Sequence, residues 1–386
     1  MKILYGVVGE GMGHATRSRV VLEHLLAIGH QIHVVVSGRA HPFLMESFRD
    51  RPGFSVQEIQ GLRLVYKEGG IDKSESFWTN VQAAPNDLRK NLEAYGSIAG
   101  RFEPELVISD FESWAYFFGM AHELPIVSID NMQVINRCRH QAVITDSRCF
   151  NFLVSKMAVK AKLPHAYHYL VSSFFYPPVR KRRTTLLPPI LRPEILAARR
   201  EPGEHVLVYQ TADTHSELIP LLQRLPYSFR VYGIGEDEER GNVSLRGFSQ
   251  QGFIDDLRTA RAVVAGGGYS LMGEAVHLQV PMLSIPLQGQ YEQELNARYL
   301  AETGYGRWAR MLEEESIVSF LQDVDTHQHH LMRYTPRGNE MLFSCVDELI
   351  GRVEMGDPRP DFLESPNLGD YVASQIDEEI GPETGG

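Results

Sequence analysis

The first half of the chain alternates short apolar segments with longer segments of helical pattern. β-Branched residues dominate four runs that are typical of buried strands, at residues 2–8, 31–37, 105–110 and 125–130. Residues 16–30 have the apolar spacing of an amphipathic helix that ends at Gly29. This alternation predicts parallel β-α-β units, with helices on both faces of a sheet.

A second alternating half follows a stretch rich in proline and arginine. It contains five further strand-like runs, at residues 205–210, 229–234, 243–248, 261–268 and 281–286. Prolines between the halves exclude a continuous helix or a central strand there, at positions 177, 178, 188, 189 and 193. We therefore expect an α/β protein of two Rossmann-like domains that face each other across a cleft.

The same pattern predicts where the domains begin and end. We expect an N-terminal domain over residues 1–185, a linker over 186–203, a C-terminal domain over 204–335, and a helix over 336–353 that crosses back to the first domain. From Glu354 onward, nine acidic residues are accompanied only by Arg359, among prolines and glycines. Residues 354–386 therefore read as an acidic, mobile tail.

Composition and charge narrow the class of protein. The 386 residues carry a net charge of −11, which disfavours nonspecific binding to nucleic acid. The three cysteines form no close pair, so neither a disulfide framework nor a Cys-x-x-Cys metal site is expected. We find no signal-peptide pattern and no apolar run of membrane-spanning length, and we expect a cytoplasmic protein.

A glycine-rich loop follows the first predicted strand. Gly9, Gly11 and Gly13 do not have the G-x-G-x-x-G spacing of a dinucleotide site, and His14 follows them at the start of a helix. Because a helix N-terminus disfavours the imidazolium form, His14 is expected to be neutral and able to act as a general base. The alternative is a structural histidine that caps the helix or packs in the core.

Three polar residues stand at the ends of later strands of the first half. Asp110 ends the third run, where its carboxylate is able to orient His14 or to cap the next helix; we weigh these two roles equally. Asp130 and Asn131 end the fourth run. The carboxyl ends of parallel strands meet at one edge of a sheet, so these side chains are expected to line the same cleft as His14.

A second glycine cluster is the most informative stretch of the chain. A buried strand runs into Gly266, Gly267 and Gly268, and a helix begins near Ser270. Backbone N–H groups at such a helix start suit a pyrophosphate. Glu274 stands one turn further on, where it is able to accept hydrogen bonds from a ribose. The end of the next strand supplies polar side chains suited to sugar hydroxyls: Gln290, Glu292, Gln293 and Asn296.

These motifs together resemble the nucleotide-sugar glycosyltransferases of the glycosyltransferase-B fold. The similarity is to the plant and antibiotic UDP- or TDP-sugar transferases and to the family that adds N-acetylglucosamine to lipid-linked muramyl-pentapeptide. It implies a donor site that matches in order and spacing at Gly267, Gly268, Ser270, Glu274, Glu292, Gln293 and Asn296. It also implies an acceptor side at the first loop, with Asp110 as the partner of His14.

The resemblance further implies an inverting reaction that needs no cofactor. Retaining relatives carry two glutamates eight residues apart, whereas Gly266 and Met282 stand eight residues on either side of Glu274. No metal ion is expected, because helix-dipole and backbone donors would stabilise the leaving diphosphate. The tryptophan-rich box of the plant enzymes is absent, so Arg246 and Phe248 are the candidates to hold the base.

Other interpretations stay open. The loop with His14 and Arg17 also resembles that of a bacterial UDP-sugar hydrolase of similar fold, in which the histidine activates water. A third possibility is a nucleotide-sugar-binding protein without catalysis. The basic linker is either a solvated hinge, which we favour, or a contact with anionic membrane lipid that would suit a lipid-linked acceptor. Its basic residues are Arg180, Lys181, Arg182, Arg183, Arg192, Arg199 and Arg200.

Overall fold

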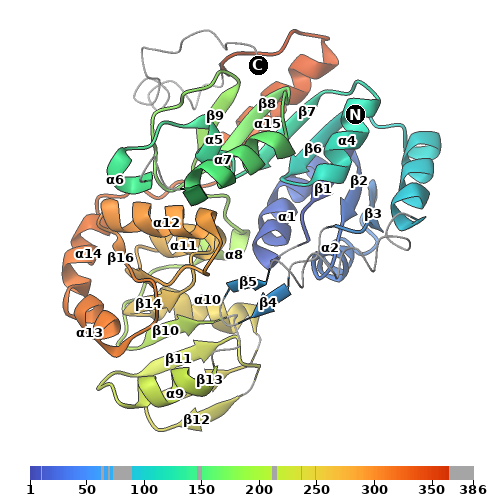
Figure 1. The fold of residues 1–386 in the computed structure, drawn as a ribbon. Helices are drawn as coiled ribbons and strands as arrows, with labels where there is room; N and C mark the ends of the chain where they lie inside the picture. Colours follow the sequence, from blue (N-terminus) through green and yellow to red (C-terminus); the bar gives the residue numbers. More distant parts are fainter. Residues whose placement is uncertain are drawn as a thin grey trace.

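The computed structural model describes residues 1–9, 11–61, 65–67, 70–72, 89–145, 150–210, 215–235, 237–247 and 249–364. Two seven-stranded sheets divide the chain into the two domains shown in Figure 1. Within the described ranges, no helix combines the length and the apolar character needed to cross a membrane.

The first sheet has the order β3-β2-β1-β6-β7-β8-β9, and all its neighbouring strands are parallel. Its strands are β1 (Lys2–Val7), β2 (Gln31–Val36), β3 (Phe54–Glu58), β6 (Leu106–Asp110), β7 (Ile126–Asp130), β8 (His168–Ser172) and β9 (Thr184–Leu187). The boundary expected after residue 185 therefore falls inside β9. A separate antiparallel pair is formed by β4 (Val65–Lys67) and β5 (Gly70–Asp72).

The second sheet has the order β12-β13-β11-β10-β14-β15-β16. It consists of β10 (Val206–Tyr209), β11 (Phe229–Tyr232), β12 (Glu238–Arg240), β13 (Val243–Arg246), β14 (Ala262–Ala265), β15 (Met282–Ser284) and β16 (Gly306–Trp308). The pair β12–β13 is antiparallel and the other neighbours are parallel. Both sheets are thus built from the β-α-β units that the hydrophobic pattern predicts.

Helices pack on these sheets. In the first half they are α1 (Met12–Ala27), α2 (Ala40–Ser47), the π-helix η1 (Ile98–Phe102), α4 (Ser113–Ala121), α5 (Val134–Arg137), α6 (Ala142–Thr145), α7 (Phe150–Lys162) and α8 (Pro193–Ala197). In the second half they are α9 (His215–Gln223), α10 (Gln250–Thr259), α11 (Tyr269–His277), α12 (Tyr291–Glu302), α13 (Glu314–Gln322), α14 (Val324–Leu331) and α15 (Glu340–Glu354).

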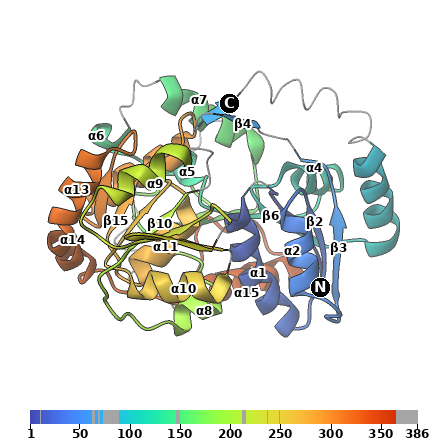
Figure 2. The ribbon, with the colours of Figure 1, turned by 90° about the horizontal axis from the view of Figure 1, so that it is seen from below.

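The last helix returns to the first domain. The buried side of α15, which includes Cys345 and Leu349, joins the core that β1, β2 and α1 form. Figure 2 shows α15 beside α1. The chain beyond it stays attached, because Leu363 is buried in the same core and the Arg183 amide donates to the Asp361 carbonyl over 2.9 Å. Residues 354–364 are therefore not the mobile segment that the sequence predicts, and residues 365–386 lie outside the described residues.

Candidate functional site

His14 and Asp110 meet at the carboxyl ends of two neighbouring strands. β1 pairs with β6 so that Val7 lies opposite Asp110. β1 ends at Val7, and α1 starts five residues later, at Met12. Gly11 makes the turn into α1 with φ at 88°, a backbone conformation that favours glycine. The Nδ1 atom of His14 then lies 2.8 Å from Oδ1 of Asp110, which is 1% exposed.

The neighbours of Nδ1 bear on which nitrogen of His14 carries the proton. Arg17 donates to Asp110 from both Nε and Nη2, so Oδ1 accepts bonds and has no proton to give. The Nη2 atom also lies 2.7 Å from Nδ1. The ionised oxygen favours a proton on Nδ1, whereas the Nη2 donor favours a lone pair there, so the contacts allow both tautomers. When Nδ1 carries the proton, Nε2 is the basic nitrogen.

The surroundings also determine the charge of this pair. Burial, followed by the Arg17 charge, lowers the pKa of His14 below its ordinary value, against the opposing effect of Asp110. Burial alone would raise the pKa of Asp110, but the Arg17 charge and the bonds from Arg17 and His14 hold it well below its usual range. The result is a neutral imidazole beside an ionised aspartate.

Arg17 connects this pair to the second domain. Its Nη1 atom donates to Oδ1 of Asn131 over 2.6 Å, and Nδ2 of Asn131 donates to Oε1 of Glu292 over 2.6 Å. Arg17 is 4% exposed, so its guanidinium is occupied within the protein. Ser18 completes the shell of Asp110 with a 3.0 Å bond to Oδ2. A continuous polar chain thus runs from His14 across the domain boundary.

Asp130 has a more local role than the sequence suggested. It is fully buried and accepts bonds from Ser128 Oγ, over 2.6 Å, and from the Gln133 amide, over 2.8 Å. Burial raises its pKa to about 6 in spite of these bonds. Its carboxylate organises the turn that leads into α5. Of the two residues that end β7's run, Asn131 is the one that extends to the other domain.

The N-termini of α1 and α11 meet at the domain boundary. A Cβ atom on Gly13 would lie only 2.6 Å from Oγ of Ser270, so the absence of a side chain allows the two helix starts to approach. Gly267 is equally constrained, because a Cβ there would lie 2.6 Å from the Gln293 carbonyl oxygen. A Cβ on Gly268, by contrast, would enter open space. The positive ends of two helix dipoles therefore converge beside His14.

The polar residues after β15 bond mainly to one another and to the glycine turn before α11. Gln293 Oε1 accepts from the amides of Gly267 and Leu287, each over 3.1 Å, and its Nε2 donates to Gln290 over 2.5 Å. Asn296 donates to Oε1 of Glu292 over 2.5 Å. Burial raises the pKa of Glu292, against the bonds from Asn296 and Asn131. Gly266 leads into the same turn, where a Cβ would lie 3.8 Å from Gln293.

Glu274 has a partner that the sequence analysis missed. Arg192, from the linker, donates to both of its carboxylate oxygens over 2.7 and 2.8 Å. The side chains of Glu274 and Arg192 are 8% and 12% exposed, respectively. Burial raises the pKa of Glu274 and the Arg192 charge opposes this rise. The residues are 82 positions apart and no local pattern connects them. One acceptor position on each oxygen remains for a ligand.

The two residues expected to hold the base are placed differently. Arg246 ends β13 and lies 3.7 Å from Glu239 of β12, with its side chain 37% exposed. Phe248 lies outside the described residues.

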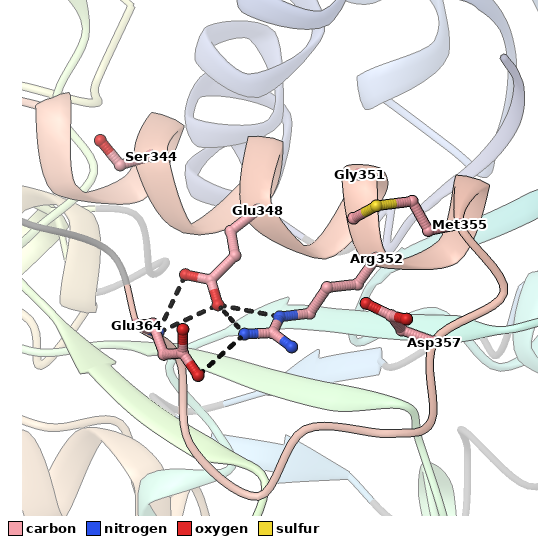
Figure 3. Close-up of a pocket in the computed structure, with 7 residues that line it drawn as sticks. All are labelled: Ser344, Glu348, Gly351, Arg352, Met355, Asp357 and Glu364. Atoms are coloured by element: carbon pink, nitrogen blue, oxygen red, sulfur yellow. Dashed lines mark hydrogen bonds and ion pairs between the residues drawn. The ribbon is translucent and has the colours of Figure 1, made fainter.

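Two further features lie away from this site. A pocket of 530 Å³ is lined by Glu348, Arg352 and Glu364, among others, and Figure 3 shows these charges paired with one another. It lies toward the amino ends of β8 and β9, opposite the edge where His14 is found.

The chain also contains one Asp-x-Asp sequence, at 323–325, where Asp323 pairs with Arg307. Among the described residues, no group of three or more His, Cys, Asp or Glu could hold a metal ion.

Comparisons with known proteins agree with the fold. An uncharacterized glycosyltransferase of Methanosarcina acetivorans is 25% identical over 339 residues, which cover 80% of this chain and 85% of that protein. A UDP-N-acetylglucosamine–N-acetylmuramyl-(pentapeptide) pyrophosphoryl-undecaprenol N-acetylglucosamine transferase of Shouchella clausii is 39% identical over 81 residues, 19% of this chain and 22% of that protein.

A solved structure extends the comparison to the whole fold. UDP-glucose:anthocyanidin 3-O-glucosyltransferase, solved with UDP, superposes with a TM-score of 0.65 at 13% identity, over 92% of this chain and 99% of that chain. This likeness confirms the expected glycosyltransferase-B architecture of two Rossmann-like domains. The family model described as glycosyl transferase family 1 matches residues 1–325. This chain therefore belongs to glycosyl transferase family 1.

Proposed function

We propose that the protein moves a hexosyl group from a UDP-sugar to an acceptor hydroxyl, with inversion and with His14 as the general base. The observation that carries the proposal is the position of His14, which Asp110 orients at the point where the N-termini of α1 and α11 meet. A base and a diphosphate-binding element are the two parts that such a transfer requires.

The proposed reaction is a single displacement. Nε2 of His14 takes the proton of the acceptor hydroxyl while that oxygen forms a bond to the anomeric carbon. The bond from the anomeric carbon to the diphosphate oxygen breaks, and the diphosphate leaves with both electrons. Backbone N–H groups at the start of α11, next to Gly268, stabilise the negative charge that develops. This arrangement requires no metal ion.

Similar proteins support the donor. The Shouchella clausii relative is named for a UDP-N-acetylglucosamine substrate, and the superposed anthocyanidin 3-O-glucosyltransferase for UDP-glucose. Each of these two nucleotide-sugars donates a hexosyl group. The free acceptor positions of Glu274 suit the ribose, and Glu292, with the neighbouring Gln293, suits the hydroxyls of the sugar.

The donor site can be tested with a substitution that the fold tolerates. Gly268→Val places a side chain in open space at the start of α11, whereas Gly351→Val does the same on α15 and is the matched control. We expect UDP-sugars to raise the melting temperature of the wild type and of Gly351→Val but not of Gly268→Val. A panel of UDP-, TDP-, GDP- and ADP-sugars in which none stabilises the wild type would refute the proposal.

Product analysis separates the alternatives. A glycosylated acceptor with UDP supports transfer, and loss of this product in His14→Gln, with donor stabilisation retained, supports the role of His14. Free sugar and UDP formed without an acceptor would indicate a hydrolase. Unchanged turnover in His14→Gln would show that the histidine is structural.

A further inference from the structure

The helices α6 and α7 present an apolar face to solvent. In the described part of the chain, five of the seventeen large, exposed apolar side chains fall between residues 143 and 157. They are Val143, Phe150, Leu153, Val154 and Met157, with exposed fractions from 45% to 76%. The four on α7 are spaced i, i+3, i+4 and i+7, so they form one stripe. Phe152 and Val159 are the buried residues of this helix.

This stripe points away from the protein because α7 is anchored on its other side. Phe152 lies 5.6 Å from the ring of Tyr291 on α12, measured between centroids, and Arg298 of α12 donates to the Ile144 carbonyl of α6 over 2.7 Å. Figure 2 shows α6 and α7 at the edge of the molecule. A helix with an apolar outer face and an anchored inner face is unusual for a surface exposed only to water.

Positive charge surrounds the apolar stripe. Between Asp146 and Glu194 the sequence has no acidic residue but nine lysines and arginines, in a chain whose net charge is −11. Lys156 and Lys160 lie on α7 and Arg180 is exposed beside them. Burial and the charges of Arg137, Arg180, Lys160 and Lys156 lower the pKa of Lys181 to about 8, which reflects how closely the cations gather here.

The remaining basic residues of the linker do not form such a patch. Arg182 pairs with Asp361 over 2.9 Å, and Arg192 pairs with Glu274. Arg183 and Arg200 donate to backbone carbonyls, of Ala166 and Arg258. Arg180 and Lys181 donate to Asn136 over 3.3 and 2.8 Å, but their charges also act together with those of Lys156 and Lys160 on α7. They are the two of the seven basic residues that we assign to the patch, and the exposed Arg199 is not one of them.

We propose that the α6–α7 face, rimmed by Arg180 and Lys181, docks on a membrane that contains anionic lipid. An interfacial helix inserts its apolar stripe at the boundary between headgroups and acyl chains while its lysines contact the phosphates. The concentration of cations in an otherwise acidic protein matches a negatively charged surface. This docking does not depend on the proposed transfer reaction, since the face lies outside the donor and base sites.

Vesicle flotation tests the proposal. We expect the full-length wild type to float with phosphatidylcholine vesicles that contain phosphatidylglycerol, to bind pure phosphatidylcholine more weakly, and to dissociate as salt is raised. The double variant Phe150→Ser/Met157→Ser should reduce the partition coefficient by about tenfold or more. The matched control Met332→Ser/Met355→Ser removes two equally exposed methionines elsewhere and should leave binding unchanged.

Charge and fold are checked separately. Lys160→Glu/Arg180→Glu should abolish the preference for anionic vesicles, whereas Arg199→Glu, an exposed arginine of the linker, should not. Circular dichroism spectra and melting temperatures that match those of the wild type show that the variants are folded. The proposal is overturned if the wild type does not float with anionic vesicles, or if the Phe150/Met157 variant floats equally well. A dimer in light scattering that this variant dissociates would also overturn it, as the face would then be a self-interface.

Discussion

Asp110→Asn is the substitution that most directly tests the proposed base. Asp110 is almost fully buried and accepts bonds from Nε and Nη2 of Arg17, from Nδ1 of His14 and from Oγ of Ser18. An asparagine keeps one acceptor oxygen and replaces the other by an NH₂ group. In either orientation that NH₂ faces donors, and the guanidinium of Arg17 loses its counter-ion.

The size of the effect follows from this geometry. Removing one partner of a buried ion pair costs about 3–5 kcal/mol. At about 2.1 cal/mol/K of unfolding entropy per residue, the melting temperature of a chain of 386 residues shifts by about 1.2 °C per kcal/mol, so it should fall by roughly 4–6 °C. With no ionised oxygen to favour a proton on Nδ1, Nε2 loses its basic role, and kcat should fall by about 10²- to 10⁴-fold, the usual contribution of general base catalysis.

The assay combines calorimetry with turnover of the nucleotide-sugar below the melting temperature of the variant. Ser18→Ala is the control, because it removes one bond to Asp110 and leaves its charge, so kcat should be nearly unchanged. If Asp110→Asn is folded by circular dichroism and its kcat is within about threefold of the wild type, Asp110 does not orient the base and the mechanism is wrong.

Three further expectations concern the surrounding network. Arg192→Met and Glu274→Met should each destabilise the protein by about 3–5 kcal/mol in urea unfolding, and the double variant Arg192→Met/Glu274→Met should recover most of the loss; additive effects would show that the pair is not coupled. Because the pKa of His14 is lowered, kcat/KM should be constant through neutral pH and fall only below pH 6.5, the ordinary pKa of histidine. The stability that the neutral form contributes is likewise lost as the pH drops below 6.5. His14→Gln should remove this part of the pH dependence of both quantities. Asn131→Ala removes bonds to two charged groups, each worth about 1.5–3 kcal/mol, and should raise the donor KM and the radius of gyration measured by X-ray scattering; an unchanged KM would separate Asn131 from the donor site.

The part of the site that lies close to strand ends could be predicted from sequence. His14 and Asp110 each follow a buried apolar run directly, and parallel strands align their carboxyl ends at one edge of a sheet. The glycines at 266–268 predicted a helix start near Ser270, and α11 begins at Tyr269, directly after them. In both cases a local pattern determines the geometry.

The partners of these residues could not be predicted in the same way. Arg192 looked like one of several solvated linker arginines, and its bond to Glu274 depends on how the linker passes α11. Residues 168–172 form a strand before the proline-rich stretch and residues 184–187 form one within it, and their short length hides them from a periodicity argument. Such contacts are decided by packing between distant segments, which a single sequence does not record.

One carboxylate serves two purposes in this arrangement. Asp110 orients His14 and also neutralises Arg17, and Arg17 in turn holds the Asn131 amide that bonds to Glu292 of the second domain. Burial and, after it, the positive charge of Arg17 lower the pKa of His14, so the residue that supports the contact between the domains also contributes to a neutral imidazole at the proposed base. A movement that separates Asn131 from Glu292 removes one of the restraints on the Arg17 guanidinium. Arg17 therefore links the pKa of His14, the proposed base, to the contact between the domains.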